Sequence, residues 1–433
     1  MRGKRFDQVL LLAVFAATAV AAVACARDDR QLEQRGEILF TEETFDGNDR
    51  VCGTCHEPEV FGTITPAFVE EQFALDPDGP LFRAIDSDDG DGRSYERLRE
   101  HATIRVAIAT PYDEVLDRVI RRCDVPEQDT VSVFRGNPTV FNVALDEALM
   151  HDGREGGDLE TQALNAILAH NEPGRDPDPA ELTAIARFQE AMFSHADVKA
   201  FLDRGAELPL PAGTTPSEIR GRTFFAPNRP CGICHSGPML NRASEFHPDA
   251  PEAVGSRFES TSVGAEPDNP NPKYEWCFVD PVTNEISPPA VLPLETAPEY
   301  VRNGRVFRRP VADPGTALIR DPANDFMLTF PDGSDVNVTS ALISAIVGLP
   351  LFKIPTLWGT PNTPPYFHDN SAADLDEVLE HYNFMFREDF PEMAESAGCD
   401  ATECLSEQDR ADIIAFMQLL SFEGEGILSP PPP

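Results

Sequence analysis

Basic residues are scarce in this chain. Its 433 residues include 35 lysines and arginines against 74 aspartates and glutamates, which gives a formal net charge of −39. This balance excludes nucleic acid as a partner, because binding to phosphates requires positive charge. Such an acidic surface would attract a basic soluble protein at low salt; a solvated surface adapted to a salty habitat explains the charge equally well.

Apolar runs long enough to span a membrane are also absent. Basic residues within positions 2–5 precede an apolar run at 9–24, which is shorter than the roughly 20 residues that a bilayer requires. This pattern is typical of a secretory signal, so we expect residues 1–24 to be a signal peptide and the mature protein to be exported to the periplasm. The sequence AVAC resembles a lipoprotein cleavage site, which leaves lipidation at Cys25 and ordinary cleavage nearby both open.

The nine cysteines sort by their sequence context. Four lie in a repeated CxxCH motif, at 52–56 and 231–235. Apart from Cys25, the others are Cys123, Cys277, Cys399 and Cys404. Export permits disulfides, so we expect the last two to close a local loop and, by elimination alone, the first two to pair.

The CxxCH motif has a specific chemistry. Its two thiols can form thioethers to the vinyl groups of one haem, and the adjacent histidine can bind the iron. A thioredoxin-type pair requires no following histidine, and a zinc site would require four ligands brought together. We therefore predict two covalent c-type haems. Their ligands are Cys52, Cys55 and His56 for haem one, and Cys231, Cys234 and His235 for haem two.

The two motifs belong to a duplicated pattern. RGEILF at 35–40 precedes the first motif, and RGRTFF at 220–225 precedes the second. Far downstream of each lies an amphipathic, helix-like stretch, ELTAIARFQEAM at 181–192 and EQDRADIIAFMQLL at 407–420. We infer two similar helical domains that meet near the proline-rich segment 208–216.

The predicted fold is therefore mostly α, with two cytochrome-c-like helical domains that each hold one covalent c-type haem. The domains are expected at 27–207 and 208–425, followed by a proline-rich tail at 426–433. Within the second domain, residues 244–345 are rich in Pro, Asn and Asp and lack helical periodicity. We expect long irregular loops there, with a few short strands.

Three segments resemble a known family. FKIPTLWGTPNTPPYFHDNSAADLDEVLEHY at 352–382 resembles the segment after the second haem motif in bacterial di-haem cytochrome c peroxidases and their MauG-type relatives. GNPTVFNVAL at 136–145 and HDGREGGDLETQALNAI at 151–167 are similar to the segment between the motifs. The resemblance covers most of the chain outside two insertion-like regions, about 66–130 and 244–345.

The resemblance assigns peroxide reduction to haem one. Many relatives carry a removable distal histidine shortly after the first motif, but residues 57–100 contain neither histidine nor methionine. We therefore expect a permanently accessible first haem, as in MauG. His101, His151 and His170 are alternatives that could fold back onto the iron.

The resemblance also implies catalytic residues beside haem one. It places Gln162 at the peroxide-orienting position and Glu172 at the acid/base position. A carboxylate there can relay a proton between the peroxide oxygens, which contributes roughly 10²–10⁴-fold. The alternative for Glu172 is a surface residue that caps a loop. His151 replaces the tryptophan that the family usually keeps between its haems, and it could be only a packed, hydrogen-bonded histidine.

At haem two the resemblance implies an outer iron ligand in the helix that follows YFHDNS. The corresponding position is Tyr382, as in MauG-type proteins, and Met385 is the alternative one turn further on. A phenolate favours ferric and higher oxidation states, whereas a methionine raises the potential. Tyr382 could instead be an interface aromatic.

Calcium is a further option implied by the resemblance. Thr363 and Pro365 match carbonyl ligands of the family's ion, but the asparagine position is Gly136, with Asn137 one residue late. The sequence therefore allows calcium without requiring it.

We therefore expect a di-haem cytochrome c peroxidase that reduces hydrogen peroxide at haem one. Its electrons would pass through haem two from a small cytochrome c or cupredoxin. The alternatives are a MauG-like oxidase that acts on a protein or small molecule, and a non-enzymatic di-haem electron carrier.

Overall fold

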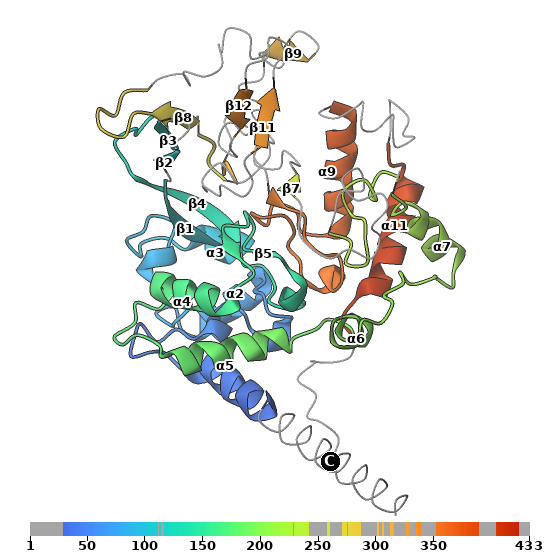
Figure 1. Cartoon of the computed structure of the whole chain (residues 1–433), viewed down its shortest axis with the longest axis horizontal. Coiled ribbons are helices and arrows are strands. Elements are labelled where there is room, and N and C mark those ends of the chain that lie inside the picture. The colour runs from blue at the N-terminus through green and yellow to red at the C-terminus, as the bar shows by residue number, and fades with distance from the viewer. Residues whose placement is uncertain are drawn as a thin grey trace, which may run out of the picture. The chain divides into compact units, whose positions relative to one another are not determined.

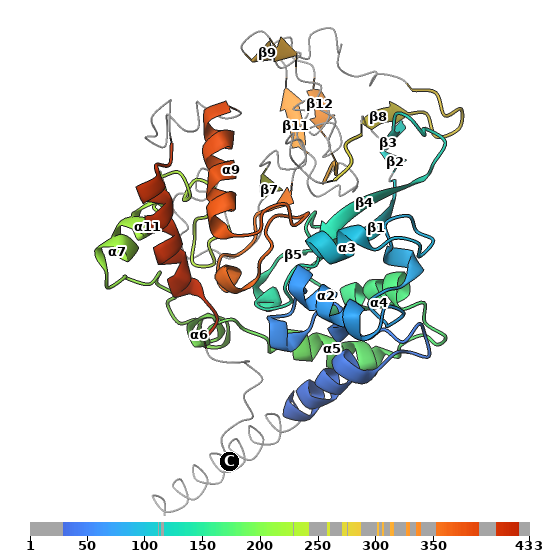
Figure 2. The ribbon, with the colours of Figure 1, turned by 180° about the vertical axis from the view of Figure 1, so that it is seen from behind.

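The structure is a computed structural model, shown from opposite sides in Figures 1 and 2. It describes residues 29–110, 112–113, 117–227, 229–241, 258–259, 271–274, 276–286, 301–302, 305–306, 312–315, 326–329, 335–338, 352–388 and 404–423. The predicted signal peptide, Cys25, Cys399 and the tail at 426–433 lie outside these ranges. No helix in the described ranges is long and apolar enough to cross a membrane.

The chain divides into two compact units. Unit 1 comprises Met1–Thr54 and Asp158–Met192, and unit 2 comprises Cys55–Gly157 and Phe193–Pro433. The division falls inside the first CxxCH motif, between Thr54 and Cys55. These units are defined by packing, so they do not test which residues bind each haem. The two haem domains, expected to meet at 208–216, stay a prediction.

Unit 1 is helical over most of its described length. Residues 29–42 form a helix. The later elements are the 3-10 helix η1 (Cys52–Thr54), α4 (Leu159–His170) and α5 (Pro179–Glu190). Helix α5 begins with a capping box, in which the side chains of Asp178 and Glu181 each accept a hydrogen bond from the other's backbone N–H. It covers most of the amphipathic stretch 181–192, so the predicted helix is confirmed.

Gly36 allows the first helix of unit 1 to approach α5 closely. A Cβ atom at position 36 would lie 2.0 Å from the carbonyl oxygen of Ala184 and 2.7 Å from Cβ of Phe188. Neither atom belongs to the far end of a flexible side chain. Glycine is therefore required by this contact between backbones.

Unit 2 repeats this contact with α7 (Pro216–Thr223) and α11 (Glu407–Met417), which lie side by side in Figure 1. A Cβ at Gly221 would lie 1.9 Å from the carbonyl oxygen of Asp412 and 2.9 Å from Cβ of Phe416. In both units the glycine of the RGxxxF pattern thus meets two residues four positions apart on the distant helix. The predicted internal repeat is confirmed.

The other described helices of unit 2 vary in length, from short 3-10 helices to one α-helix of 14 residues. They are η2 (Pro58–Val60), α2 (Pro66–Leu75), η3 (Ala84–Asp86), α3 (Glu96–His101), η4 (Val143–Leu145), α6 (Ala196–Arg204), η8 (Thr360–Asn362), α9 (Leu375–Glu388) and η9 (Gln418–Leu420). Helix α9 runs beside α11 (Figure 2).

Unit 2 also contains strands. Those between residues 103 and 156 were not predicted, whereas those between residues 258 and 338 fall in the region 244–345, where a few short strands were expected. The longest antiparallel pair joins β1 (Thr103–Ala109) to β4 (Thr130–Gly136). One face of this pair is buried, and its buried side chains include Ile108, Val131 and Val133. The shorter strands are β2 (Tyr112–Asp113), β3 (Arg118–Arg122), β5 (Ala148–Leu149), β6 (Glu155–Gly156), β7 (Phe258–Glu259), β8 (Trp276–Val279), β9 (Val301–Arg302), β10 (Arg305–Val306), β11 (Phe326–Thr329), β12 (Asp335–Val338) and β13 (Phe352–Lys353). The described chain therefore mixes helices and strands, and the mostly α prediction is correct only in part.

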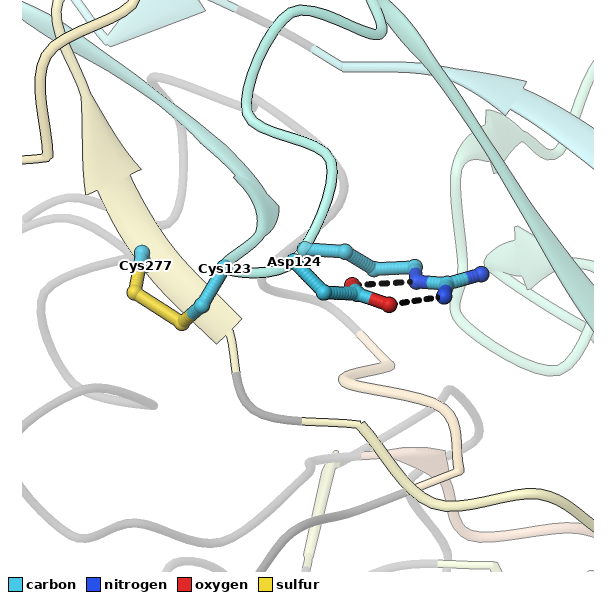
Figure 3. Close-up of a disulfide and its surroundings, with 4 residues drawn as sticks. Cys123, Asp124 and Cys277 are labelled. Atoms are coloured by element: carbon cyan, nitrogen blue, oxygen red, sulfur yellow. Dashed lines mark hydrogen bonds and ion pairs between the residues drawn. A yellow bond between two sulfur atoms is a disulfide. The ribbon is translucent and has the colours of Figure 1, made fainter.

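Strands β2, β3 and β8 form one sheet, in which the two insertion-like regions meet. A disulfide joins Cys123, just after β3, to Cys277 in β8, with a Cα–Cα distance of 5.2 Å (Figure 3). The pairing inferred by elimination is thus confirmed. Cys404 is also disulfide-bonded, and its expected partner Cys399 lies outside the described residues.

The largest described core of unit 2 surrounds the second CxxCH motif. Its buried residues include Phe193, Val198, Phe224, Phe225, Met239, Leu240, Leu357, Trp358, Leu375, Leu379, Ile413, Phe416 and Leu420. Cys231 and Tyr382 pack against it. This core therefore brings the motif together with α9, α11 and the segment 352–362.

Candidate functional site

The cysteines of the two motifs differ from the other cysteines that the structure describes. Cys52, Cys55, Cys231 and Cys234 are thiols. Cys123, Cys277 and Cys404 are in disulfides. This separation fits motif thiols that are reserved for another covalent partner, as haem attachment requires.

The histidine of the first motif is held by two neighbouring segments of unit 2. Nδ1 of His56 lies 3.1 Å from the carbonyl oxygen of Gly62 and 3.1 Å from the Asn137 amide nitrogen. The same amide donates to the carbonyl of Cys55, and the Asn137 carbonyl accepts a hydrogen bond of 2.6 Å from Thr63. Donation from Nδ1 to Gly62 would leave Nε2 as the nitrogen that can bind iron.

Glu172 is held in unit 1, next to the segment that leads into the first motif. Its Oε2 accepts a hydrogen bond of 3.0 Å from the Asn48 amide, which also donates to the carbonyl of His170. The Asn171 amide donates to the carbonyl of Arg50 at 2.9 Å. Glu172 has a φ of 47°, a left-handed conformation that a non-glycine residue adopts only when its surroundings impose it.

The remaining predicted residues of the haem-one side have identifiable places. Gln162 is half-buried in α4, in the same unit as Glu172. His170 ends that helix, and His101 ends α3. Nε2 of His151 lies 3.0 Å from the carbonyl oxygen of Gly136.

His151 lies in a buried, charged environment within unit 2. Burial is the main cause that lowers its pKa to about 3, and the neighbouring His368 and Arg135 lower it further. The ring is therefore neutral, and it can donate from Nε2 to Gly136. This supports a packed, hydrogen-bonded histidine at the position where the family usually keeps a tryptophan.

Arg135 is the centre of that environment. Its Nη1 lies 2.6 Å from Oδ2 of Asp152, and its Nε lies 2.7 Å from Oδ2 of Asp313. All three side chains are almost completely buried. The sequence did not reveal this cluster, because its members are far apart in the chain.

At the second motif, His235 is buried and its Nδ1 lies 2.7 Å from the carbonyl oxygen of Leu240. Burial lowers the pKa of His235 to about 4, so the ring is neutral and Nε2 can bind iron. Two side chains fix the intervening loop: Trp358 Nε1 donates to the carbonyl of Pro238 at 2.9 Å, and Thr356 Oγ1 donates to that of Met239 at 2.8 Å.

Tyr382 lies in α9, beside the thiols of the second motif. Burial raises the pKa of its phenol well above the usual range, and the nearby Cys234 and Cys231 raise it further. Met385 is buried one turn further on and packs with Phe386. The structure thus brings Tyr382 to the second motif, and its role as an iron ligand stays a prediction.

Two buried polar groups fit a bound cofactor with polar substituents. Within the described chain, the Asn241 amide nitrogen and oxygen and Nε2 of His368 have no hydrogen-bond partner. Asn241 is only 1% exposed and directly follows Leu240, whose carbonyl holds His235. Leaving such groups unsatisfied costs about 1–3 kcal/mol each, which a haem propionate near Asn241 could offset. The residues present therefore fit a haem at the second motif.

Two of the positions considered for a calcium ligand have other contacts. The Asn137 amide donates to the carbonyl of Cys55, and the carbonyl oxygen of Gly136 lies 3.0 Å from Nε2 of His151. Among the described residues, no group of three or more His, Cys, Asp or Glu could hold a metal ion. Calcium stays an option that the sequence allows without requiring it.

Comparisons with known proteins agree with the residues of the site. The model of the di-haem cytochrome c peroxidase family matches residues 30–204. A solved MauG-like protein associated with microbial copper homeostasis is 16% identical, with a TM-score of 0.43 over 91% of this chain and 90% of that chain. The diheme peroxidase BthA from Burkholderia thailandensis is 13% identical, with a TM-score of 0.41 over 93% of this chain and 88% of that one. No curated protein matches. The resemblance seen in the sequence is thus confirmed over residues 30–204, which match the model of the di-haem cytochrome c peroxidase family.

Proposed function

We propose that this chain is an exported di-haem c-type cytochrome peroxidase. It reduces hydrogen peroxide to water at the first CxxCH motif, and electrons from a small redox protein reach that motif through the second. The main support is the pair of CxxCH motifs, in each of which Nδ1 of the histidine lies against a backbone carbonyl and leaves Nε2 for the iron. Haem supplies the redox chemistry at both motifs when it is bound.

Glu172 is the proposed proton relay. Peroxide reduction consumes two electrons and two protons for each two waters formed, and a carboxylate can move a proton from the inner to the outer peroxide oxygen. The hydrogen bond from Asn48 fixes one carboxylate oxygen, which leaves the other to exchange the proton. Gln162 orients the peroxide in this proposal.

Tyr382 is the proposed outer ligand at the second motif. Its location beside Cys231 and Cys234 and its burial support this role. A phenolate ligand stabilises oxidised iron. The same observation favours the second candidate function, a MauG-like oxidase that stores oxidising equivalents and acts on a protein or small molecule.

Stopped-flow spectroscopy separates these functions. Stoichiometric hydrogen peroxide is added to the fully oxidised, haem-loaded protein, and the Soret band is followed. A prompt shift means that the first site is open at rest, and turnover with a reduced small cytochrome then distinguishes the peroxidase from the oxidase. An unchanged band, both in the oxidised and in the half-reduced protein, would leave only an electron carrier and reject the proposal.

Glu172→Gln tests the proton relay. Peroxide turnover should decrease by roughly 10²–10⁴-fold, while both haem spectra stay unchanged. Glu190→Gln is the matched control, because Glu190 pairs with Arg187 on the surface of the same unit. Equal turnover in the two variants would remove Glu172 from the mechanism.

A further inference from the structure

We propose that electrons reach the second haem site through Trp358, from an entry patch formed by His195, Asp197 and Glu423. This inference rests on the proposed function, because it names the path by which a donor protein would feed the enzyme. Neither Trp358 nor this patch is among the residues assigned to the two haem sites above.

The inner end of the path is joined to the loop that holds the iron-binding histidine. Trp358 is only 2% exposed, and its Nε1 donates to the carbonyl of Pro238 at 2.9 Å. Pro238 lies between His235 and Leu240, which are themselves joined by the 2.7 Å contact at Nδ1. One hydrogen bond and a short stretch of chain thus separate the indole from the proposed ligand of the second iron.

The outer end of the path reaches solvent. The rings of Trp358 and His195 have centroids 5.1 Å apart, and the His195 side chain is 16% exposed. Nε2 of His195 lies 2.8 Å from Oε1 of Glu423, a carboxylate that is half exposed. A ring contact and a hydrogen bond therefore connect the buried indole to the surface.

The charge on this path favours transient oxidation of the indole. The Asp197 N–H donates to Nδ1 of His195, which leaves Nε2 to donate to Oε1 of Glu423 at 2.8 Å. The carbonyl of Pro238 cannot accept a proton from Trp358, so an oxidised indole keeps its N–H and becomes a cation. A carboxylate one ring away stabilises that positive charge.

Each electron passes in two steps. After one peroxide has withdrawn two electrons from the haem-loaded protein, Trp358 would give one electron to the site at the second motif, and the resulting indole cation would take one electron from the donor at the patch. Two such passes supply the two electrons that one peroxide consumes. Because Asp197 and Glu423 make the patch negative, it fits a one-electron donor protein with a basic contact face.

The matched pair Trp358→Phe and Trp276→Phe tests this path, since the chain has only these 2 tryptophans. In the haem-loaded protein that has first been mixed with stoichiometric peroxide, stopped flow measures how fast a reduced, basic, small c-type cytochrome passes electrons to the enzyme. Trp358→Phe should slow this transfer by about tenfold or more, and Trp276→Phe should leave it unchanged. After peroxide addition, electron paramagnetic resonance should show an indole radical in the wild-type protein and in Trp276→Phe. The signal should be absent in Trp358→Phe.

Several outcomes would overturn the inference. A Trp358→Phe rate within about twofold of wild type, with normal haem spectra, rejects the path and leaves the peroxidase proposal intact. A wild-type protein that neither takes up electrons nor consumes peroxide rejects both. If Trp358→Phe does not fold, Glu423→Gln keeps the indole and removes only the charge. It should slow the transfer several-fold and weaken its salt dependence, and an unchanged rate would again reject the path.

Discussion

Replacement of Gly221 by alanine should destabilise unit 2, because the added methyl group has no space. Its carbon would lie 1.9 Å from the carbonyl oxygen of Asp412, whereas ordinary contacts begin at 3.4 Å, so α7 and α11 must move apart by about 1.5 Å. Overpacking of this kind costs up to about 3 kcal/mol, and the better helix propensity of alanine offsets about 1 kcal/mol. The expected net loss of unfolding free energy is therefore about 2 kcal/mol.

Thermal unfolding of the haem-loaded protein, followed by far-ultraviolet circular dichroism, measures this loss. Gly156→Ala is the control, because no atom lies within 4 Å of a Cβ at that position and its melting temperature should stay the same or rise slightly. Gly36→Ala should act like Gly221→Ala, since its Cβ would lie 2.0 Å from the Ala184 carbonyl oxygen. Equal melting temperatures for Gly221→Ala and Gly156→Ala would refute the reasoning, and a stable Gly36→Ala would reject the equivalence of the two contacts.

Three further predictions concern buried and cross-linked groups. Burial tends to raise the pKa of Asp152, but Arg135 and Arg154 outweigh it and hold the pKa at about 2. Because this value lies below that of an unfolded aspartate, about 3.9, the carboxylate stabilises the fold above about pH 4 and loses this contribution as the pH decreases to about 2. Asp152→Asn should therefore cost about 3 kcal/mol at pH 7 and flatten the acid limb of a urea-unfolding series; an unchanged acid limb would contradict this. Cys123→Ser should lower the unfolding free energy by about 2–5 kcal/mol in the same assay, and a wild-type midpoint would show that the cross-link adds nothing. Tyr382→Phe should change the spectrum of one haem only; identical spectra would exclude the phenol as a ligand.

The sequence predicted the repeat and its two amphipathic helices because these depend on local, periodic signals. The RGxxxF pattern and the two amphipathic stretches were visible, and the structure brings Gly36 and Gly221 against those stretches. The strands β1 and β4 were missed, although TIRVAIA and TVSVFRG have the β-branched alternation typical of strands. Strand β1 lies inside, and β4 at the end of, the region 66–130 that the family resemblance did not cover.

The supporting residues of the site could not be predicted, because their contacts depend on tertiary structure. Trp358 meets a carbonyl 120 positions away, and Asn137 meets one 82 positions away. No sequence window contains both partners of such a contact. No sequence pattern marks Asn241 either. This residue is notable only because its buried side-chain amide has no hydrogen-bond partner in the described chain.

The disulfide of unit 2 closes a loop with a sequence separation of 154 residues, and the second CxxCH motif lies inside that loop. Its cross-link changes what a protease can do to this protein. A single backbone cut at any point between Cys123 and Cys277 would leave both fragments covalently joined. Such a nicked molecule would stay together through purification and denaturation, and it would separate into two chains only after reduction.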